Sequence, residues 1–237
     1  MDQKELQRIT NILLSDRMIN HFDSKKYVDW AILLIQNGYQ SEHLFILAGL
    51  DNEDFIVIDR YFAKAVSDLG ITITNDKNIM LATYAEQIAL DVINKDIAPL
   101  IGLDILTKVY WASDSDSRYK AFANLKDDFD YFSYDGYTIY NSNITKDNQD
   151  SFVKNECALF LEMPDFFTKI AALNMAKYVY CASCHSIGEY ATKSKRRFYK
   201  KINIITCPYC GARDIYNPND QITRRKFMEY IKNRYQV

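Results

Sequence analysis

The sequence predicts a mainly α-helical protein that ends in a small β hairpin and a terminal helix. Apolar residues make up 48% of the 237 residues, and the hydrophobic runs have helical spacing. Glycine and proline are scarce, with seven and four residues, which disfavours a β sandwich with many tight turns. Two Cys-x-x-Cys pairs near the C-terminus indicate a metal site in the non-helical part.

The first half of the chain is expected to be entirely helical. Large apolar residues recur three or four apart in each segment, as in the series Phe55, Ile58 and Phe62. Short polar residues precede several segments, and Gly38 and Gly70 stand where two of them should end. The segments expected to be helical are 3–20, 24–37, 41–49, 52–69, 76–92 and 97–111.

The second half is expected to alternate helices with turns. A loop at 114–117 leads into a helix over 117–132, and residues 134–140 combine turn chemistry with some β character. A strong helix runs from about residue 147 to Met163 and ends at Pro164. Residues 165–176 form one more helix, which enters the first Cys-x-x-Cys turn without a linker. The metal-binding part is therefore expected to pack against the helical body.

The last segments complete this expected architecture. Residues 187–192 and 198–206 have the composition of two hairpin arms, and Asp220 can cap a final helix over 221–235.

Cys181, Cys184, Cys207 and Cys210 are the most specific chemical signal in the chain. Two cysteines separated by two residues can direct both sulfurs to one point, and two such turns complete a tetrahedron. The 22 residues between the pairs slightly exceed the usual spacer. With four thiolates no coordination position is left for an activated water, so a structural Zn²⁺ is predicted, with iron as the less favoured metal.

The competing interpretations of these cysteines are disulfide bonds and a redox-active pair. Disulfides require an oxidising compartment, and the N-terminal residues have no secretory signal, so a cytoplasmic location is expected. A redox Cys-x-x-Cys usually leads into the helix of a βαβ unit, which neither pair clearly does.

Residues 178–216 resemble zinc ribbons and rubredoxins. The resemblance is carried by the four cysteines and by Cys207-Pro-Tyr-Cys210-Gly211, and it implies two metal-binding turns, or knuckles. His185 follows Cys184 where glycine is common, which is a departure from the family pattern.

The N-terminal part has a second, weaker resemblance. Tyr27-Val-Asp-Trp30-Ala31, Gly38-Tyr39-Gln-Ser41 and Leu47-Ala48-Gly49-Leu50 look like segments of helical bacterial proteins of unassigned function. Some of those proteins are suspected immunity or defence factors. The resemblance covers about residues 25–160 and carries no site residue.

Charge divides the chain into an acidic domain, 1–164, and a basic domain, 165–237. The basic part has 14 Lys and Arg against five Asp and Glu, a formal charge of +9, whereas 1–164 carries −11. Basic and aromatic residues interleave between the knuckles, a composition that suits phosphate contact and base stacking. A solvated tip, a protein partner and the chain's own acidic part are alternatives for this surface. The candidate nucleic-acid-binding residues are Lys193, Lys195, Arg196, Arg197, Phe198, Tyr199, Lys200, Lys201, Arg224 and Arg225.

The leading functional prediction is a non-enzymatic cytoplasmic binding protein. The alternative is an immunity-type protein that binds a protein partner through its acidic part, with Asp127, Asp128 and Asp130 as candidate contacts. An aspartate-dependent hydrolase is a third hypothesis, although no histidine or glycine loop accompanies these acids. No catalytic residue is assigned. Trp30 and Trp111 are expected in the core, and no apolar run is long enough to cross a bilayer.

Overall fold

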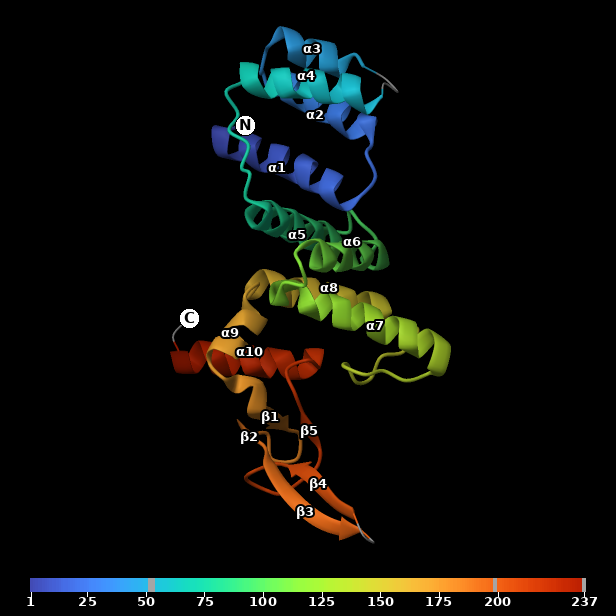
Figure 1. Ribbon diagram of the computed structural model, residues 1–237, viewed down its shortest axis with the longest axis vertical. Coiled ribbons are helices and arrows are strands. Elements are labelled where there is room, and N and C mark those ends of the chain that lie inside the picture. The colour runs from blue at the N-terminus through green and yellow to red at the C-terminus, as the bar shows by residue number, and fades with distance from the viewer. Residues whose placement is uncertain (51–53, 198–199, 236–237) are drawn as a thin grey trace. The chain divides into compact units, whose positions relative to one another are not determined.

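A computed structural model describes residues 1–50, 54–197 and 200–235, apart from the side chains of 195–202 (Figure 1). The protein is mainly α-helical, as predicted. The chain forms two compact units, Met1–Ile88 and Ala89–Val237. No helix in the described ranges combines the length and apolar character needed to span a bilayer.

The first unit contains four helices and most of a fifth. The bounds are α1 (Gln3–Ile19), α2 (Ser24–Gln36), α3 (Glu42–Ala48), α4 (Phe55–Asp68) and α5 (Lys77–Asn94), the last of which continues into the second unit. Side chains of Asp2, Asp23, Ser41 and Asp54 accept backbone N–H groups at the starts of α1 to α4. Trp30 lies in the core of this unit, as expected, where its ring packs edge-on against Phe62.

The helices of the second unit follow in chain order. Their bounds are α6 (Pro99–Ala112), the 3₁₀ turn η1 (Ser117–Tyr119), α7 (Lys120–Asp135), α8 (Gln149–Glu162), α9 (Phe166–Ala172), the 3₁₀ turn η2 (Met175–Lys177) and α10 (Gln221–Tyr235). Pro99 occupies the first turn of α6, where its missing N–H costs nothing. The prediction for Trp111 is wrong: it lies near the end of α6 with 65% of its surface exposed.

The β character expected at 134–140 is also absent. Helix α7 continues to Asp135 and ends at Gly136, whose φ of +71° is the left-handed conformation that glycine adopts readily. The chain then returns along α7 as an irregular loop.

Asp128 of α7 holds this loop. Its carboxylate accepts N–H groups from Ile139 at 2.6 Å, Tyr140 at 2.9 Å and Asn141 at 2.7 Å, and the Asn141 side-chain amide at 2.8 Å. Asp128 is fully buried, so its prediction as a partner contact is wrong. A buried carboxylate is stable only when its oxygens are satisfied, and the loop backbone does this.

A buried ion pair joins α8 to α10. Arg224 Nη2 lies 2.7 Å from Glu156 Oε2, and both side chains are 2% exposed. The same guanidinium donates to the carbonyl of Pro218 at 2.9 Å, and Gln221 Nε2 donates to Glu156 at 2.9 Å. Arg224 was predicted to contact nucleic acid, and this prediction is wrong because its guanidinium is enclosed by Glu156 of α8 and the chain before α10.

The strands form two small antiparallel sheets near the C-terminus (Figure 1). Strand β1 (Tyr178–Cys181) pairs with β2 (Ile187–Glu189) and β5 (Ile215–Tyr216). The long hairpin pairs β3 (Ala191–Arg197) with β4 (Lys200–Thr206) in a register from Ala191–Thr206 to Arg197–Lys200. The expected first arm, 187–192, is therefore corrected, since β2 belongs to the other sheet.

The strands are built onto the helices of the second unit. Tyr180 of β1 belongs to an apolar cluster with Phe227 and Ile231 of α10, with Leu159 of α8 and with Met163, which follows α8. Lys226 Nζ lies 5.1 Å from the centre of the Tyr180 ring. Residues 165–237 thus belong to the compact unit 89–237. The predicted domain boundary at residue 164 marks a change in net charge and stays a prediction.

Replacing Arg224 should destabilise the fold far more than replacing its neighbour. Arg224→Ala leaves Glu156 buried without its cation, which should lower the free energy of unfolding by about 3–5 kcal/mol. Arg225→Ala is the matched control, because that side chain is half-exposed and its nearest carboxylate oxygen is 3.8 Å away. It should cost less than about 0.5 kcal/mol. Urea unfolding measures both, and equal losses would contradict a structural role for Arg224.

Asp128→Ala should lower the free energy of unfolding because it releases the loop after α7, whereas Asp127→Ala should not. The first change removes the acceptor of three backbone N–H groups and should cost about 2–4 kcal/mol. Asp127 is exposed on the same helix, and its replacement should change stability by less than about 0.5 kcal/mol. Thermal and urea unfolding of the two variants provide the comparison. If they unfold alike, Asp128 does not anchor the loop.

Candidate metal centre

The two Cys-x-x-Cys turns have the same backbone hydrogen bonds. In the first, His185 N donates to Cys181 O at 2.8 Å and Cys181 N donates to Ser186 O at 2.9 Å. In the second, Gly211 N donates to Cys207 O at 3.1 Å and Cys207 N donates to Ala212 O at 2.8 Å. The structure therefore contains two equivalent knuckles, as the resemblance to zinc ribbons implies.

The four cysteine sulfurs converge on one point. The Sγ atoms of Cys181 and Cys210 are 3.6 Å apart, as are those of Cys184 and Cys207, and all four lie within 4.8 Å of one another. Metal–sulfur bonds of about 2.3 Å in a tetrahedron require sulfur–sulfur distances of about 3.8 Å. A disulfide requires about 2.05 Å, so none joins these cysteines. The arrangement fits a tetrahedral metal ion.

Neighbouring groups lower the pKa of two of the four thiols, those of Cys184 and Cys207. The N–H of Ala212 lowers the pKa of Cys210, but burial and the other three cysteines raise it to about 12. The Ser186 hydroxyl lies 2.9 Å from Cys184 Sγ and lowers the pKa of that thiol. Burial would raise the pKa of Cys207, but the backbone N–H groups of Cys210 and Tyr209 lower it to about 6. Since a thiolate is the metal-binding form of cysteine, these groups prepare the site for a cation.

The residue after each knuckle has a left-handed backbone. Gly211 has φ +74° and His185 has φ +55°, so the histidine occupies a conformation that usually requires glycine. The His185 ring Nδ1 lies 2.8 Å from the Tyr180 hydroxyl, and the ring is not part of the four-sulfur group. This contact with β1 offsets the backbone strain and explains the departure from the zinc-ribbon pattern.

The lack of a side chain at Gly188 lets the second knuckle pack closely against the sheet. A Cβ atom on Gly188 would meet the Tyr209 ring at 2.7 Å, closer than real Cβ contacts allow. The Tyr209 ring therefore lies directly over β2. Lys193 of β3 reaches the same knuckle: its Nζ lies 3.1 Å from the point that a Cβ atom on Gly211 would occupy.

The candidate nucleic-acid-binding residues are divided by the structure. The basic candidates of the hairpin lie in β3, at positions 193 and 195–197, and in β4, at positions 200 and 201. The structure describes the backbone of all six, but of their side chains it describes only that of Lys193. Phe198 and Tyr199 lie outside the described residues. Arg225 is exposed on α10 and stays a candidate, whereas Arg224 is buried.

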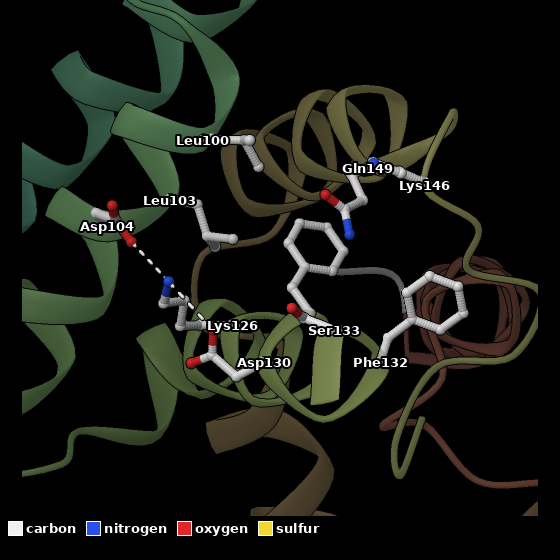
Figure 2. A pocket seen from close by; sticks show the side chains of 10 residues that line it. Leu100, Leu103, Asp104, Lys126, Asp130, Phe132, Ser133, Lys146 and Gln149 are labelled. Carbon is white, nitrogen blue, oxygen red and sulfur yellow. Dashed lines mark ion pairs between the residues drawn. The ribbon is translucent and has the colours of Figure 1, made fainter. Parts of the chain in front are cut away.

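The candidate acidic residues form no metal site. Within the described ranges, the four cysteines are the one group of three or more potential ligands that converge. Asp130 lines a pocket of about 490 Å³ between α6 and α7 (Figure 2). There Lys126 Nζ lies 3.1 Å from Asp104 and 3.4 Å from Asp130, so one cation bridges two carboxylates. The geometry gives the aspartate-dependent hydrolase hypothesis no support.

The fifth cysteine, Cys157, is remote from this chemistry. It is buried in α8, and burial raises the pKa of its thiol to about 12, so it is not a nucleophile at neutral pH.

Comparisons with known proteins return no relative of this chain. No protein-family model matches it, and neither a curated protein nor a solved structure does. The resemblance of residues 25–160 to suspected immunity factors therefore receives no support. The metal centre rests on its own geometry.

The chain should bind one metal ion through all four cysteines. Cys181→Ser or Cys207→Ser removes a buried thiolate and should reduce the bound metal, measured by elemental analysis, to well below one ion per chain. Cys157→Ser is the control and should leave the metal content unchanged. A chelator should lower the melting temperature of the native protein and of the control. An unchanged melting curve would contradict a structural metal.

Proposed function

We propose that this protein is a non-enzymatic binding protein whose C-terminal zinc ribbon presents a basic hairpin to nucleic acid. Zinc is proposed because four thiolates in a closed tetrahedral arrangement are its usual structural ligands. With every coordination position occupied by sulfur, the ion supports the fold and activates no water.

The hairpin needs such support because it has little core of its own. None of the described side chains of β3 and β4 belongs to the apolar cluster around α10. The hairpin is joined to that cluster through β1, β2 and the two knuckles. Metal binding therefore contributes directly to the folding of this part of the chain.

The single observation that carries the proposal is the strand register near the hairpin tip, which pairs two positions of like charge twice. The register places Arg196 opposite Lys201 and Arg197 opposite Lys200. Like charges directly opposite each other destabilise an antiparallel pair, so the strand pairing alone does not favour these residues. A polyanion neutralises the repulsion, and the stabilisation then appears as binding free energy.

The positions of the cations suit a flexible single strand. Alternation along the strands places 193, 195, 197 and 200 on one face of the hairpin and 196 and 201 on the other. A phosphate backbone that passes the tip can therefore meet cations on either side. Phe198 and Tyr199 are the candidate stacking groups for its bases.

Replacing the tip arginines should weaken nucleic-acid binding and reduce its salt dependence. For Arg196→Ala with Arg197→Ala, the slope of log affinity against log salt for a single-stranded oligonucleotide should fall by about 1.4. The control, Lys4→Ala with Lys64→Ala, makes the same charge change at exposed sites in the first unit and should leave the slope unaltered. Fluorescence anisotropy of a labelled oligonucleotide at several salt concentrations measures both.

Two results would reject the proposed function. One is the absence of binding, or affinity that does not vary with salt. The other is full binding after chelation of the metal, because the hairpin would then not depend on the ribbon.

A further inference from the structure

The pocket between α6 and α7 has a volume that suits a small ligand. It encloses about 490 Å³, within the range of about 300–1,000 Å³ that is usual for small-molecule sites. Three segments of the unit 89–237 line it: α6, α7 and the start of α8 with Lys146 before it (Figure 2). Apolar and charged side chains therefore face one hollow.

The apolar part of the pocket lies between the two helices. Leu103 of α6 and Phe129 of α7 are almost fully buried, with 1% and 6% of their surface exposed. Leu100 and Phe132 line the pocket as well and are more exposed. An apolar group of a ligand that covers these four side chains leaves water, which favours binding.

One end of the pocket is negative. Lys126 Nζ lies 3.1 Å from Asp104 and 3.4 Å from Asp130, so two carboxylates share one ammonium group. Burial opposes the charge of Lys126, but its hydrogen bond to Asp104 and the charges of both aspartates raise the pKa of the ammonium group, which is therefore charged at neutral pH. The three groups together carry a formal charge of −1. Because both carboxylates are 55% exposed, a second cation can still reach them.

The other end of the pocket has a cation and polar groups that are not engaged. The side chains of Ser133, Lys146 and Gln149 make no hydrogen bond or ion pair with another residue in the part of the chain that the structure describes. Figure 2 shows Gln149 and Lys146 across the pocket from the cluster of three charged groups. Asp147 and Asp150 are exposed and close in sequence, but they do not line the pocket. This end therefore offers one positive charge and an amide that can donate.

The two ends are separated along α7. Lys126 and Ser133 lie on one face of the helix, seven residues apart, which corresponds to about 10 Å of helical rise. A free amino acid carries its ammonium and its carboxylate on the same carbon, so it can contact only one end. In a dipeptide the next Cα atom is about 3.8 Å further along, and a hydrogen bond of about 2.9 Å at each end brings the total close to this span.

We propose that this pocket binds a dipeptide that has free termini and apolar side chains. The ammonium group of the dipeptide lies beside Asp104 and Asp130, where two cations then alternate with two carboxylates. Its carboxylate accepts hydrogen bonds from Lys146 and Gln149, and its side chains lie over the apolar part of the pocket. A ligand with opposite charges matches ends of opposite sign, whereas a nucleotide, whose charges are all negative, fits only one of them.

Isothermal titration calorimetry of the full-length, metal-loaded protein tests the pocket with four probes. Leucyl-phenylalanine is the complete ligand and should bind as one molecule per chain. Its N-acetyl form lacks the ammonium group, its C-terminal amide lacks the carboxylate, and glycylglycine lacks the apolar side chains. Each of these three should bind about tenfold more weakly, because each leaves one part of the pocket without its partner.

Variants assign each terminus of the dipeptide to its residues. Asp130→Asn should weaken the binding of leucyl-phenylalanine about tenfold but leave that of the N-acetyl form unchanged, because that form has no ammonium group. Lys146→Gln should weaken leucyl-phenylalanine about threefold and leave the C-terminal amide unchanged, since Lys146 is exposed and its ion pair is partly screened. Asp147→Asn and Lys177→Gln make the same charge changes at exposed sites outside the pocket and should alter binding less than about twofold. The melting temperature verifies that each variant is folded.

The outcomes distinguish this proposal from the proposed nucleic-acid function. The Arg196→Ala and Arg197→Ala variant should bind leucyl-phenylalanine as the native protein does, since its changes are in the hairpin. The proposal is overturned if leucyl-phenylalanine does not bind, if its N-acetyl or amide form binds equally well, or if Asp130→Asn and Asp147→Asn lose equal affinity. Displacement of the dipeptide by a single-stranded oligonucleotide would overturn it as well, because the pocket would then belong to a nucleic-acid surface.

Discussion

The buried polar chain that ends in the Arg224–Glu156 ion pair connects the parts of the unit 89–237. Glu156 receives the guanidinium of Arg224 and the amide of Gln221, and Gln221 N donates to the Asn141 side chain. Asn141 donates to Asp128 of α7. One connected set of hydrogen bonds thus joins α7, the loop after it, α8 and α10. Because each group is buried, the loss of one partner leaves another polar group unsatisfied. Few substitutions should therefore be tolerated at the positions of this network.

This framework holds both the loop after α7 and the sheet of β1. Asp220, next to Gln221, accepts the N–H of Ser142 at 2.9 Å and caps α10 through the N–H of Thr223 at 3.0 Å. The start of α10 therefore fixes the loop that carries Tyr137 and Ile139. The middle of the same helix contributes Phe227 to the apolar cluster that holds β1 and the first knuckle. Helix α10 therefore supports both the loop after α7 and the sheet that carries the first knuckle.

The two parts of this unit are stabilised in different ways. The helical part is held by apolar burial and by the polar network, whereas the hairpin has mostly polar strands and leads into the four converging cysteine sulfurs. Small modules that cannot bury enough apolar surface commonly use a metal for this purpose. Under the proposed function, the metal supports a hairpin whose register places cations opposite one another.

The sequence by itself determined the features that depend on nearby residues. Helical spacing and capping side chains act within one or two turns, and most helices follow them closely; α10 has the bounds that its pattern predicts, whereas α7 continues to Asp135, beyond its predicted end at residue 132. The knuckles are equally local, because two cysteines three positions apart already direct their sulfurs to a common point. The resemblance to zinc ribbons therefore transferred to the structure without adjustment of the four ligands.

Only the tertiary structure decided which polar and aromatic side chains are buried. Arg224 and Arg225 are adjacent and chemically identical, yet one is enclosed by Glu156, 68 residues away, and the other faces solvent. Asp127 and Asp128 divide in the same way, because the next helix turn and the returning loop cover only one of them. Trp111 was expected in the core, but it lies near the end of α6 with most of its surface exposed. Burial depends on partners that the fold brings together from distant positions, and a local pattern of charge or hydropathy contains no record of those partners.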